Sequence, residues 1–188
     1  MAIIPAREAH LTRSNPTRYQ EGVFFLARLV KECLSYAFFY HRLIDQMRSG
    51  DLQGVEYEQA RFSSFAIHDS IIVIFHKLVE GRRDSWNLRQ LHKEWCKYQQ
   101  DKTAQQSVLD LIKALEQKLQ PLVDYRHDKV AHESKSVKMT MLTSLPDRIG
   151  HLESIVTVVD QFVDGDISYS LYLHESGEEI NLRNALDI

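Results

Sequence analysis

Cysteine is scarce in this sequence, with Cys33 and Cys96 as its two representatives. Two cysteines are too few for the framework of a disulfide-stapled scaffold. Neither belongs to a recognised set of zinc ligands, so the sequence contains no zinc motif. We expect two free, buried thiols.

Long uninterrupted apolar runs are also missing. The first residues, Met1 to Glu8, lack the continuous apolar stretch of a secretory signal, and charged residues interrupt the apolar segments that follow. We therefore expect a soluble, cytoplasmic protein that does not enter a membrane.

Glycine, serine and proline are nowhere concentrated in a linker-like run, and no segment repeats at a fixed period. With 188 residues, 44% of them hydrophobic, the chain suffices for one well-formed core. We expect a single domain over residues 1–188, with its core at about 17–164 and a tail at 165–188.

The chain has no excess of positive charge, because its formal net charge is -3 at pH 7. This argues against a protein that coats nucleic acid through its overall charge. Basic residues still gather in two local clusters, the first being Arg82, Arg83, Arg89, His92 and Lys93, and the second Arg126, His127, Lys129, His132, Lys135 and Lys138. For the first cluster, helix ends with cations that complement the helix dipole are the favoured explanation.

Apolar residues spaced three and four apart predict long helices. The first is expected to begin with Asn15 as its cap and Pro16 in its first turn, and to end at Gly50. Its apolar stripe, with the spacing of a bundle or coiled-coil seam, consists of Val23, Leu26, Val30, Cys33, Ala37, Tyr40, Ile44 and Met47.

The second predicted helix, at about 55–80, carries two apolar stripes and is therefore expected at the centre of the bundle. One of these stripes includes Phe62 and Phe65, and also contains Asp69 and His76. A polar contact with a neighbouring helix explains the last two better than a functional role does.

Three further helices are predicted: a short one at about 88–98, a long one from about Ala104, and a long one from Ser144 to Gly165. Pro121 is expected to kink the second of these. Alternating apolar residues after Gly165 predict a short hairpin or a frayed end. The predicted fold class is all-α, a helical bundle of four long helices and one short helix with an irregular or hairpin-like C-terminal tail.

The main functional signal comes where the helix from Ala104 nears its end. Its apolar stripe, extended at the same spacing, leads to Arg126. An arginine on an apolar face is costly unless it has an anionic partner or reaches water. The segment then adds a density of titratable groups that packing does not require, namely His127, Asp128, Lys129 and His132.

On a continuous helix, Arg126 and His132 are about 9 Å apart in rise and about 120° in azimuth, so they flank a site. Lys129 lies between them. Asp128, four residues before His132, can orient the imidazole.

This arrangement suits RNA cleavage. His132 is the candidate general base for the 2′-hydroxyl proton, and Arg126 is the candidate group that stabilises negative charge developing on phosphorus. Three neighbouring residues are expected to support the site: His127, Asp128 and Lys129. Lys135 and Lys138 are expected to bind the RNA substrate.

The segment Arg126-His-Asp-Lys-Val-Ala-His132 resembles the signature of the HEPN superfamily, which has an arginine, a polar residue directly after it and a histidine further along, at the end of a helix. Here five residues separate Arg126 from His132, and His127 holds the polar position. The order of predicted elements from about 17 to 164 is similar to that of abortive-infection members of the superfamily.

This resemblance implies a helical bundle that pairs as a homodimer, with two motifs facing one cleft. It also implies metal-independent endoribonuclease activity without a cofactor. Such a protein would act in phage defence or a toxin-antitoxin system, restrained by a nucleotidyltransferase-type antitoxin.

Other interpretations stay open. Arg126 can be a helix-terminal cation and His132 a capping or surface residue, with Asp128 as its ion-pair partner. A noncatalytic HEPN-type binding or scaffold module would use the heptad stripes for pairing. A partner enzyme could transfer a nucleotide to Tyr125, although packing is the favoured role of that phenol. A metal site has no support, since the residues around Asp128 match no recognised ligand set.

Overall fold

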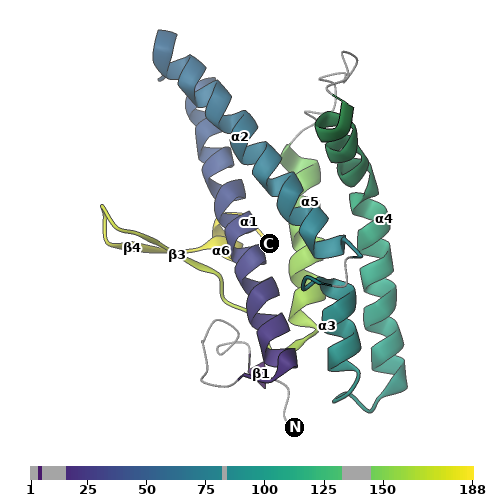
Figure 1. Ribbon diagram of the computed structural model, residues 1–188. Coiled ribbons are helices and arrows are strands. Elements are labelled where there is room, and N and C mark those ends of the chain that lie inside the picture. Colours follow the sequence, from purple (N-terminus) through teal and green to yellow (C-terminus); the bar gives the residue numbers. More distant parts are fainter. Residues whose placement is uncertain (1–3, 6–15, 82–83, 133–144) are drawn as a thin grey trace.

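The computed structural model describes residues 4–5, 16–81, 84–132 and 145–188, and their side chains at 16–81, 84–125 and 150–188. Most of these residues are helical, as the sequence predicts (Figure 1). The helices are α1 (Arg18–Ser49), α2 (Gly54–Val79), α3 (Leu88–Trp95), α4 (Lys102–His132), α5 (Leu145–Asp160) and α6 (Leu182–Ala185). The strands are β1 (Ile4–Pro5), β2 (Val163–Asp164), β3 (Ser170–Leu173) and β4 (Glu178–Asn181).

The start of α1 differs from the prediction, because Thr17 and not Asn15 is the N-cap. The Thr17 side chain accepts a hydrogen bond from the backbone N–H of Gln20, and the Gln20 side chain accepts one from the backbone N–H of Thr17. This capping box satisfies two backbone donors, so Pro16 precedes the helix and does not lie in its first turn. At the other end Gly50 has a φ of 82°, the left-handed conformation that ends a helix, as predicted.

α1 and α2 pack along each other as an antiparallel pair (Figure 1). α1 also contacts α3, α5 and α6, while α2 contacts α3 and α4. The largest fully buried side chains between these helices include Tyr19, Phe75, Tyr169 and Phe162. The Tyr19 hydroxyl donates a hydrogen bond to the backbone carbonyl of Phe162, which ties the first turn of α1 to the chain just after α5.

By length and composition alone, α2 could cross a membrane, contrary to the expectation that charges interrupt every apolar segment. A core helix of a soluble protein has the same composition. The second half of α2 fits that description, because Ile71, Ile74, Phe75 and Leu78 are buried in the core against the neighbouring helices. The first half does not, since Phe62 of the predicted apolar stripe is 64% exposed.

The predicted apolar stripe of α4 is buried at Val108, Ile112, Leu115 and Leu119, whereas Leu122, its last member, is half-buried. Pro121 lies inside α4, and the helix continues past it to His132. A kink at Pro121 stays a prediction.

The C-terminal residues form an antiparallel hairpin, one of the two predicted alternatives, in which β3 pairs with β4 from Ser170 opposite Asn181 to Leu173 opposite Glu178. The hairpin projects from the helices beside α1 (Figure 1). A second, parallel pair joins β1 to β2.

Residues around this hairpin extend the core, because Ile167, Tyr169, Leu182 and Leu186 belong to the same buried cluster as the helices. An ion pair holds them in place. Arg183 of α6 donates to the carboxylate of Asp160 at the end of α5 and to the carbonyl of Ile167, while Asp160 also accepts from the Ile167 N–H. Burial raises the pKa of Asp160, and the hydrogen bond from Arg183 opposes that effect.

Gly22 allows the segment before α3 to pack on α1. A Cβ atom at Gly22 would lie 2.7 Å and 2.8 Å from two ring carbons of Trp86, and 3.1 Å from a methyl carbon of Leu91. Arg18, one turn earlier, lies over the same indole ring at 5.7 Å. A residue without a side chain is therefore needed where Trp86 meets α1.

We predict that Gly22→Ala lowers the free energy of unfolding by up to about 2 kcal/mol. The added methyl group overpacks the contact with Trp86, at a cost of about 1–3 kcal/mol, and alanine returns about 1 kcal/mol in a helix interior. Urea unfolding measures the change. Gly150→Ala is the matched control, since that glycine also lies in a helix and its nearest neighbour, Nζ of Lys118, is at 3.8 Å. Equal effects of the two substitutions would contradict the assignment of Gly22.

Candidate functional site

The segment from Arg126 to His132 forms the last two turns of α4. Its backbone is helical throughout, so the separation of about 9 Å in rise between Arg126 and His132 applies to it. The side chains of the motif lie outside the described ones. The interactions expected of them therefore stay predictions, for Arg126, His127, Asp128, Lys129 and His132. Lys135 and Lys138, the expected substrate-binding residues, lie outside the described residues.

Tyr125, directly before the motif, packs on α2. Its half-buried ring meets His68 edge-on, with ring centroids 6.4 Å apart and an interplanar angle of 74°. His68 is 3% exposed, and its Nδ1 lies 3.4 Å from Oδ1 of Asp69. The contact agrees with a packing role for Tyr125 and places the start of the motif beside the middle of α2.

α5 holds α4 from another side. Nζ of Lys118 donates to the Gly150 carbonyl at 2.7 Å and to the Ser154 hydroxyl at 2.8 Å. His151 places its Nε2 3.3 Å from the Lys118 carbonyl and stacks on Phe75 of α2, with ring centroids 6.2 Å apart. The helix that carries the motif is therefore fixed by α2 and α5, through residues that the sequence pattern does not single out.

Asp69 and His76 each pair with a residue close by in the sequence. The expected polar contact of each with a neighbouring helix stays a prediction. His76 is 4% exposed, and its Nδ1 lies 3.3 Å from Oε2 of Glu80, one turn later. Asp69 faces His68, the residue before it. The pairing of His76 with Glu80, four residues apart, follows from helix geometry.

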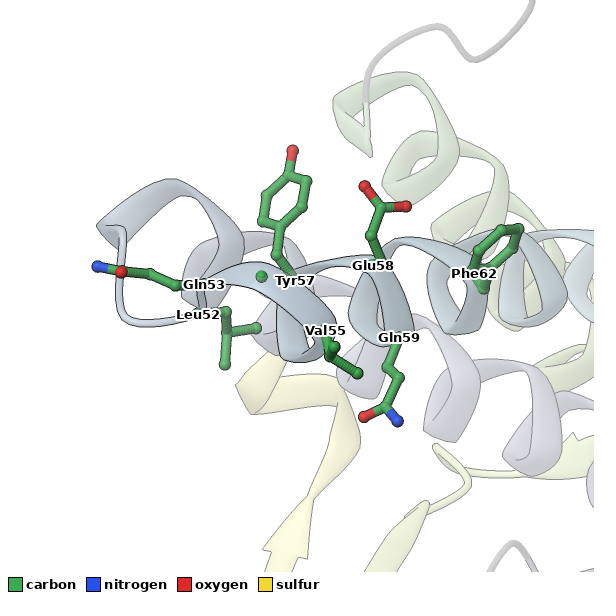
Figure 2. Close-up of a pocket in the computed structure, with 8 residues that line it drawn as sticks. Leu52, Gln53, Val55, Tyr57, Glu58, Gln59 and Phe62 are labelled. Atoms are coloured by element: carbon green, nitrogen blue, oxygen red, sulfur yellow. The ribbon is translucent and has the colours of Figure 1, made fainter.

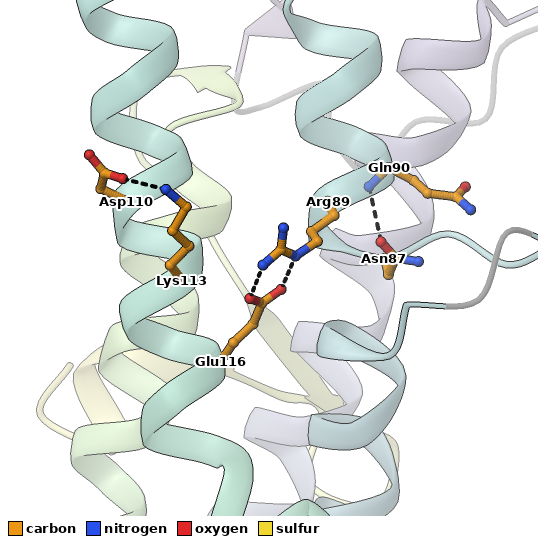
Figure 3. A network of polar contacts seen from close by, with 6 residues as sticks. All are labelled: Asn87, Arg89, Gln90, Asp110, Lys113 and Glu116. Atoms are coloured by element: carbon orange, nitrogen blue, oxygen red, sulfur yellow. Dashed lines mark hydrogen bonds and ion pairs between the residues drawn. The ribbon is translucent and has the colours of Figure 1, made fainter.

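In the first basic cluster, Arg89 contradicts the helix-end explanation. It lies in the first turn of α3, where a cation does not complement the helix dipole. Its guanidinium instead makes two hydrogen bonds to the Glu116 carboxylate of α4 (Figure 3). His92 and Lys93 do lie in the last turn of α3, as that explanation requires. Arg82 and Arg83 lie outside the described residues.

Neither thiol is suited to nucleophilic chemistry. Cys33 is buried, as predicted, and burial raises its pKa. Cys96 is half-buried, and burial raises its pKa too, although its Sγ lies 3.5 Å from Nε2 of His92. That ring nitrogen also lies 2.9 Å from the Gln105 carbonyl. A thiol that stays protonated is a weak nucleophile.

Within the part of the chain that the structure describes, no three His, Cys, Asp or Glu side chains are arranged to hold a metal ion. A hollow between α2 and α4 comes nearest to an acidic site, since Glu80 and Glu116 line it together with His76. Glu80 pairs with His76 and Glu116 pairs with Arg89, so both carboxylates already have cationic or hydrogen-bonding partners.

A second candidate surface lies where α1 turns into α2. We call residues 38–66, the C-terminal half of α1 with the N-terminal half of α2, the arm. Its apolar side chains line an open hollow, in which Val55 and Phe62 are 73% and 64% exposed and Tyr57 is 39% exposed (Figure 2). The sequence pattern assigned Phe62 to an apolar stripe, but it could not indicate that no neighbour covers this part of the stripe within the described chain.

Comparisons of the chain with protein-family models, with curated proteins and with solved structures give no match. The assignment of a site therefore depends on the residues and their geometry.

We predict that Lys118→Met lowers the free energy of unfolding by about 0.5–1.5 kcal/mol, because it removes the hydrogen bonds that join α4 to the start of α5. It should also speed amide hydrogen exchange in the first turns of α5. Lys113→Met is the matched control, since the exposed Lys113 pairs with Asp110 three residues earlier within α4, and a pair of that kind contributes about 0.3–0.5 kcal/mol. Unchanged exchange in α5 after Lys118→Met would contradict this role.

Proposed function

We propose that this chain is a metal-independent endoribonuclease in which His132 is the general base and Arg126 stabilises the transition state. The observation that carries the proposal is the unbroken helix from Lys102 to His132, which sets both residues on its last two turns. α4 packs on α2 and α5, and a packed helix supports such a pair better than a loop does.

The position at a C-terminal helix end favours this chemistry. Unpaired carbonyl groups give that end a partial negative charge. When His132 takes a proton, the imidazolium that forms is stabilised there. Arg126 and Lys129 add positive charge where the phosphate of RNA would bind.

The reaction needs no external oxidant, metal ion or cofactor. His132 removes the proton of a ribose 2′-hydroxyl as the oxygen attacks the adjacent phosphorus. Arg126 stabilises the additional negative charge on the phosphoryl oxygens. The bond from phosphorus to the 5′-oxygen breaks, that oxygen takes up a proton, and the products are a 2′,3′-cyclic phosphate and a 5′-hydroxyl end.

The cellular setting belongs to the same proposal and derives from the resemblance to HEPN proteins. The enzyme would be cytoplasmic and homodimeric, would act as a toxin in phage defence, and would be restrained by a nucleotidyltransferase-type antitoxin. His127, Asp128 and Lys129 would support the site, and Lys135 and Lys138 would bind RNA.

A noncatalytic HEPN-type binding or scaffold module is the second candidate. The exposed apolar residues of the arm favour it, because such a surface serves association and is not needed for catalysis. An RNA-cleavage assay distinguishes the two proposed functions.

We predict that the purified protein cuts RNA in EDTA and that His132→Ala lowers the rate about 100-fold or more, because a general base contributes at least that much. A short synthetic RNA, with and without a 2′-deoxy nucleotide at the cleaved position, serves as substrate. The 2′-deoxy substrate should not be cut, because it lacks the attacking hydroxyl.

His174→Ala is the matched histidine control, since His174 is exposed in the turn between β3 and β4 and remote in sequence from the motif. Arg126→Ala should also abolish cutting, while both motif variants keep the circular dichroism and melting temperature of the wild type. Equal cutting by wild type and His132→Ala, or no cutting at all, would refute the enzyme proposal. Unfolding of both motif variants would indicate a structural role for Arg126 and His132.

A further inference from the structure

Two aromatic rings of the arm share one cation. The guanidinium of Arg61 lies over the Phe62 ring, 5.0 Å from its centre, and over the Phe65 ring, 5.9 Å from its centre. Phe62 is 64% exposed, and Phe65 is half-buried. We call Arg61, Phe62 and Phe65 the platform. Its outer part is a large apolar ring that stays in contact with water.

The platform lies level with the last turns of α4. α2 and α4 run in opposite directions, and the first half of α2 is at the same end of the bundle as the end of α4 (Figure 1). The contact of His68 with Tyr125 aligns the two helices. Arg61 comes seven residues before His68, which is about two turns and returns to the same face of α2. His132 comes seven residues after Tyr125. Both therefore lie about 10 Å beyond the contact, in the same direction.

An exposed aromatic ring at this position suits an unpaired RNA base. Bases of single-stranded RNA stack on aromatic side chains and on the guanidinium planes of arginines, and they do so with little preference for sequence. In a duplex the bases are stacked on one another and paired, so that their faces are closed to a side chain. The exposed ring of Phe62 therefore favours single-stranded RNA over duplex RNA.

The charges near the platform are compatible with RNA. Glu58 is paired with Arg61, at 2.7 Å between Oε2 and a guanidinium nitrogen, so its charge is compensated. Glu56 comes six residues before Phe62, which puts it about 120° away around α2. The positive charge for the phosphate groups is expected from the motif, with Arg126 and Lys129. The platform supplies the apolar part of the binding.

We propose that Phe62, together with Arg61 and Phe65, binds an unpaired base of single-stranded RNA beside the phosphate at the motif. The occupant rests on the proposed function, because RNA is the substrate expected there, and the platform narrows that substrate to unpaired strands. Stacking holds the substrate and the transition state alike, so it contributes to binding and not to the chemical step. A module that binds RNA without cutting it could use the same platform.

The test is fluorescence anisotropy of the full chain in EDTA at one fixed salt concentration. The probe is a short, labelled single strand of 2′-O-methyl RNA, which has no free 2′-hydroxyl and cannot be cut. Wild type is expected to bind it, and Phe62→Ser should raise the dissociation constant about fivefold to a hundredfold, because the stacking of one base is lost. For a duplex of the same sequence, Phe62→Ser should not change the dissociation constant.

Phe25→Ser is the matched control, since Phe25 is 37% exposed on α1 outside the arm. Phe62→Trp should keep the affinity of wild type, because an indole ring also stacks on a base. Thermal unfolding shows whether each variant folds. Equal effects of Phe62→Ser and Phe25→Ser, or equally weak binding by Phe62→Ser and Phe62→Trp, would overturn the proposal. A wild type that binds no single strand would also overturn it and would leave the arm to a protein partner.

The platform and the ribonuclease can fail separately. On unmodified RNA, Phe62→Ser should raise KM more than it lowers kcat. Binding of the 2′-O-methyl strand that depends on Phe62, without any cutting of unmodified RNA, would refute the enzyme and keep the platform. Cutting with the same KM by wild type and by Phe62→Ser would keep the enzyme and overturn the platform.

Discussion

The packing of the second half of α2 between α1 and α4 is the constraint on which the other elements depend. Ile71, Ile74, Phe75 and Leu78 fill this contact, and each is nearly inaccessible to water. Burial of four such side chains contributes on the order of 1.5–3 kcal/mol each. The same contact fixes the position of α4 along α2, and so it determines which residue of α2 lies beside the motif.

The helical part of this fold follows from the sequence because apolar spacing reports which side of a helix is covered. It predicted most of the buried stripe of α4, while the glycine at position 50 predicted the end of α1. It does not report what covers that side. For this reason the spacing places Phe62 and His76 on the same stripe, although His76 is 4% exposed and Phe62 is 64% exposed. Caps are similarly local: Asn15 and Thr17 are both good N-cap residues, and the reciprocal bond with Gln20 selects Thr17.

The candidate site was predictable only as a segment. Arg126 and His132 stand out because titratable residues follow an apolar stripe, and a continuous helix agrees with that order. The contacts that fix the segment are long-range, as with His68 against Tyr125 and Lys118 against Gly150. Residues far apart in sequence leave no periodic signal when they meet, and neither Gly22 nor Arg183 could be assigned a role before Trp86 and Asp160 were placed beside them.

The contacts between α1 and the C-terminal elements affect how the chain folds during synthesis. α1 contacts α5 and α6, and Tyr19 is bonded to Phe162. α1 is therefore synthesised before α5 and α6, and the part of α1 that these two helices cover stays open to water until they have emerged from the ribosome. Contacts between such distant segments form slowly. During that interval the nascent chain exposes part of an apolar helix, and exposed apolar surface favours aggregation.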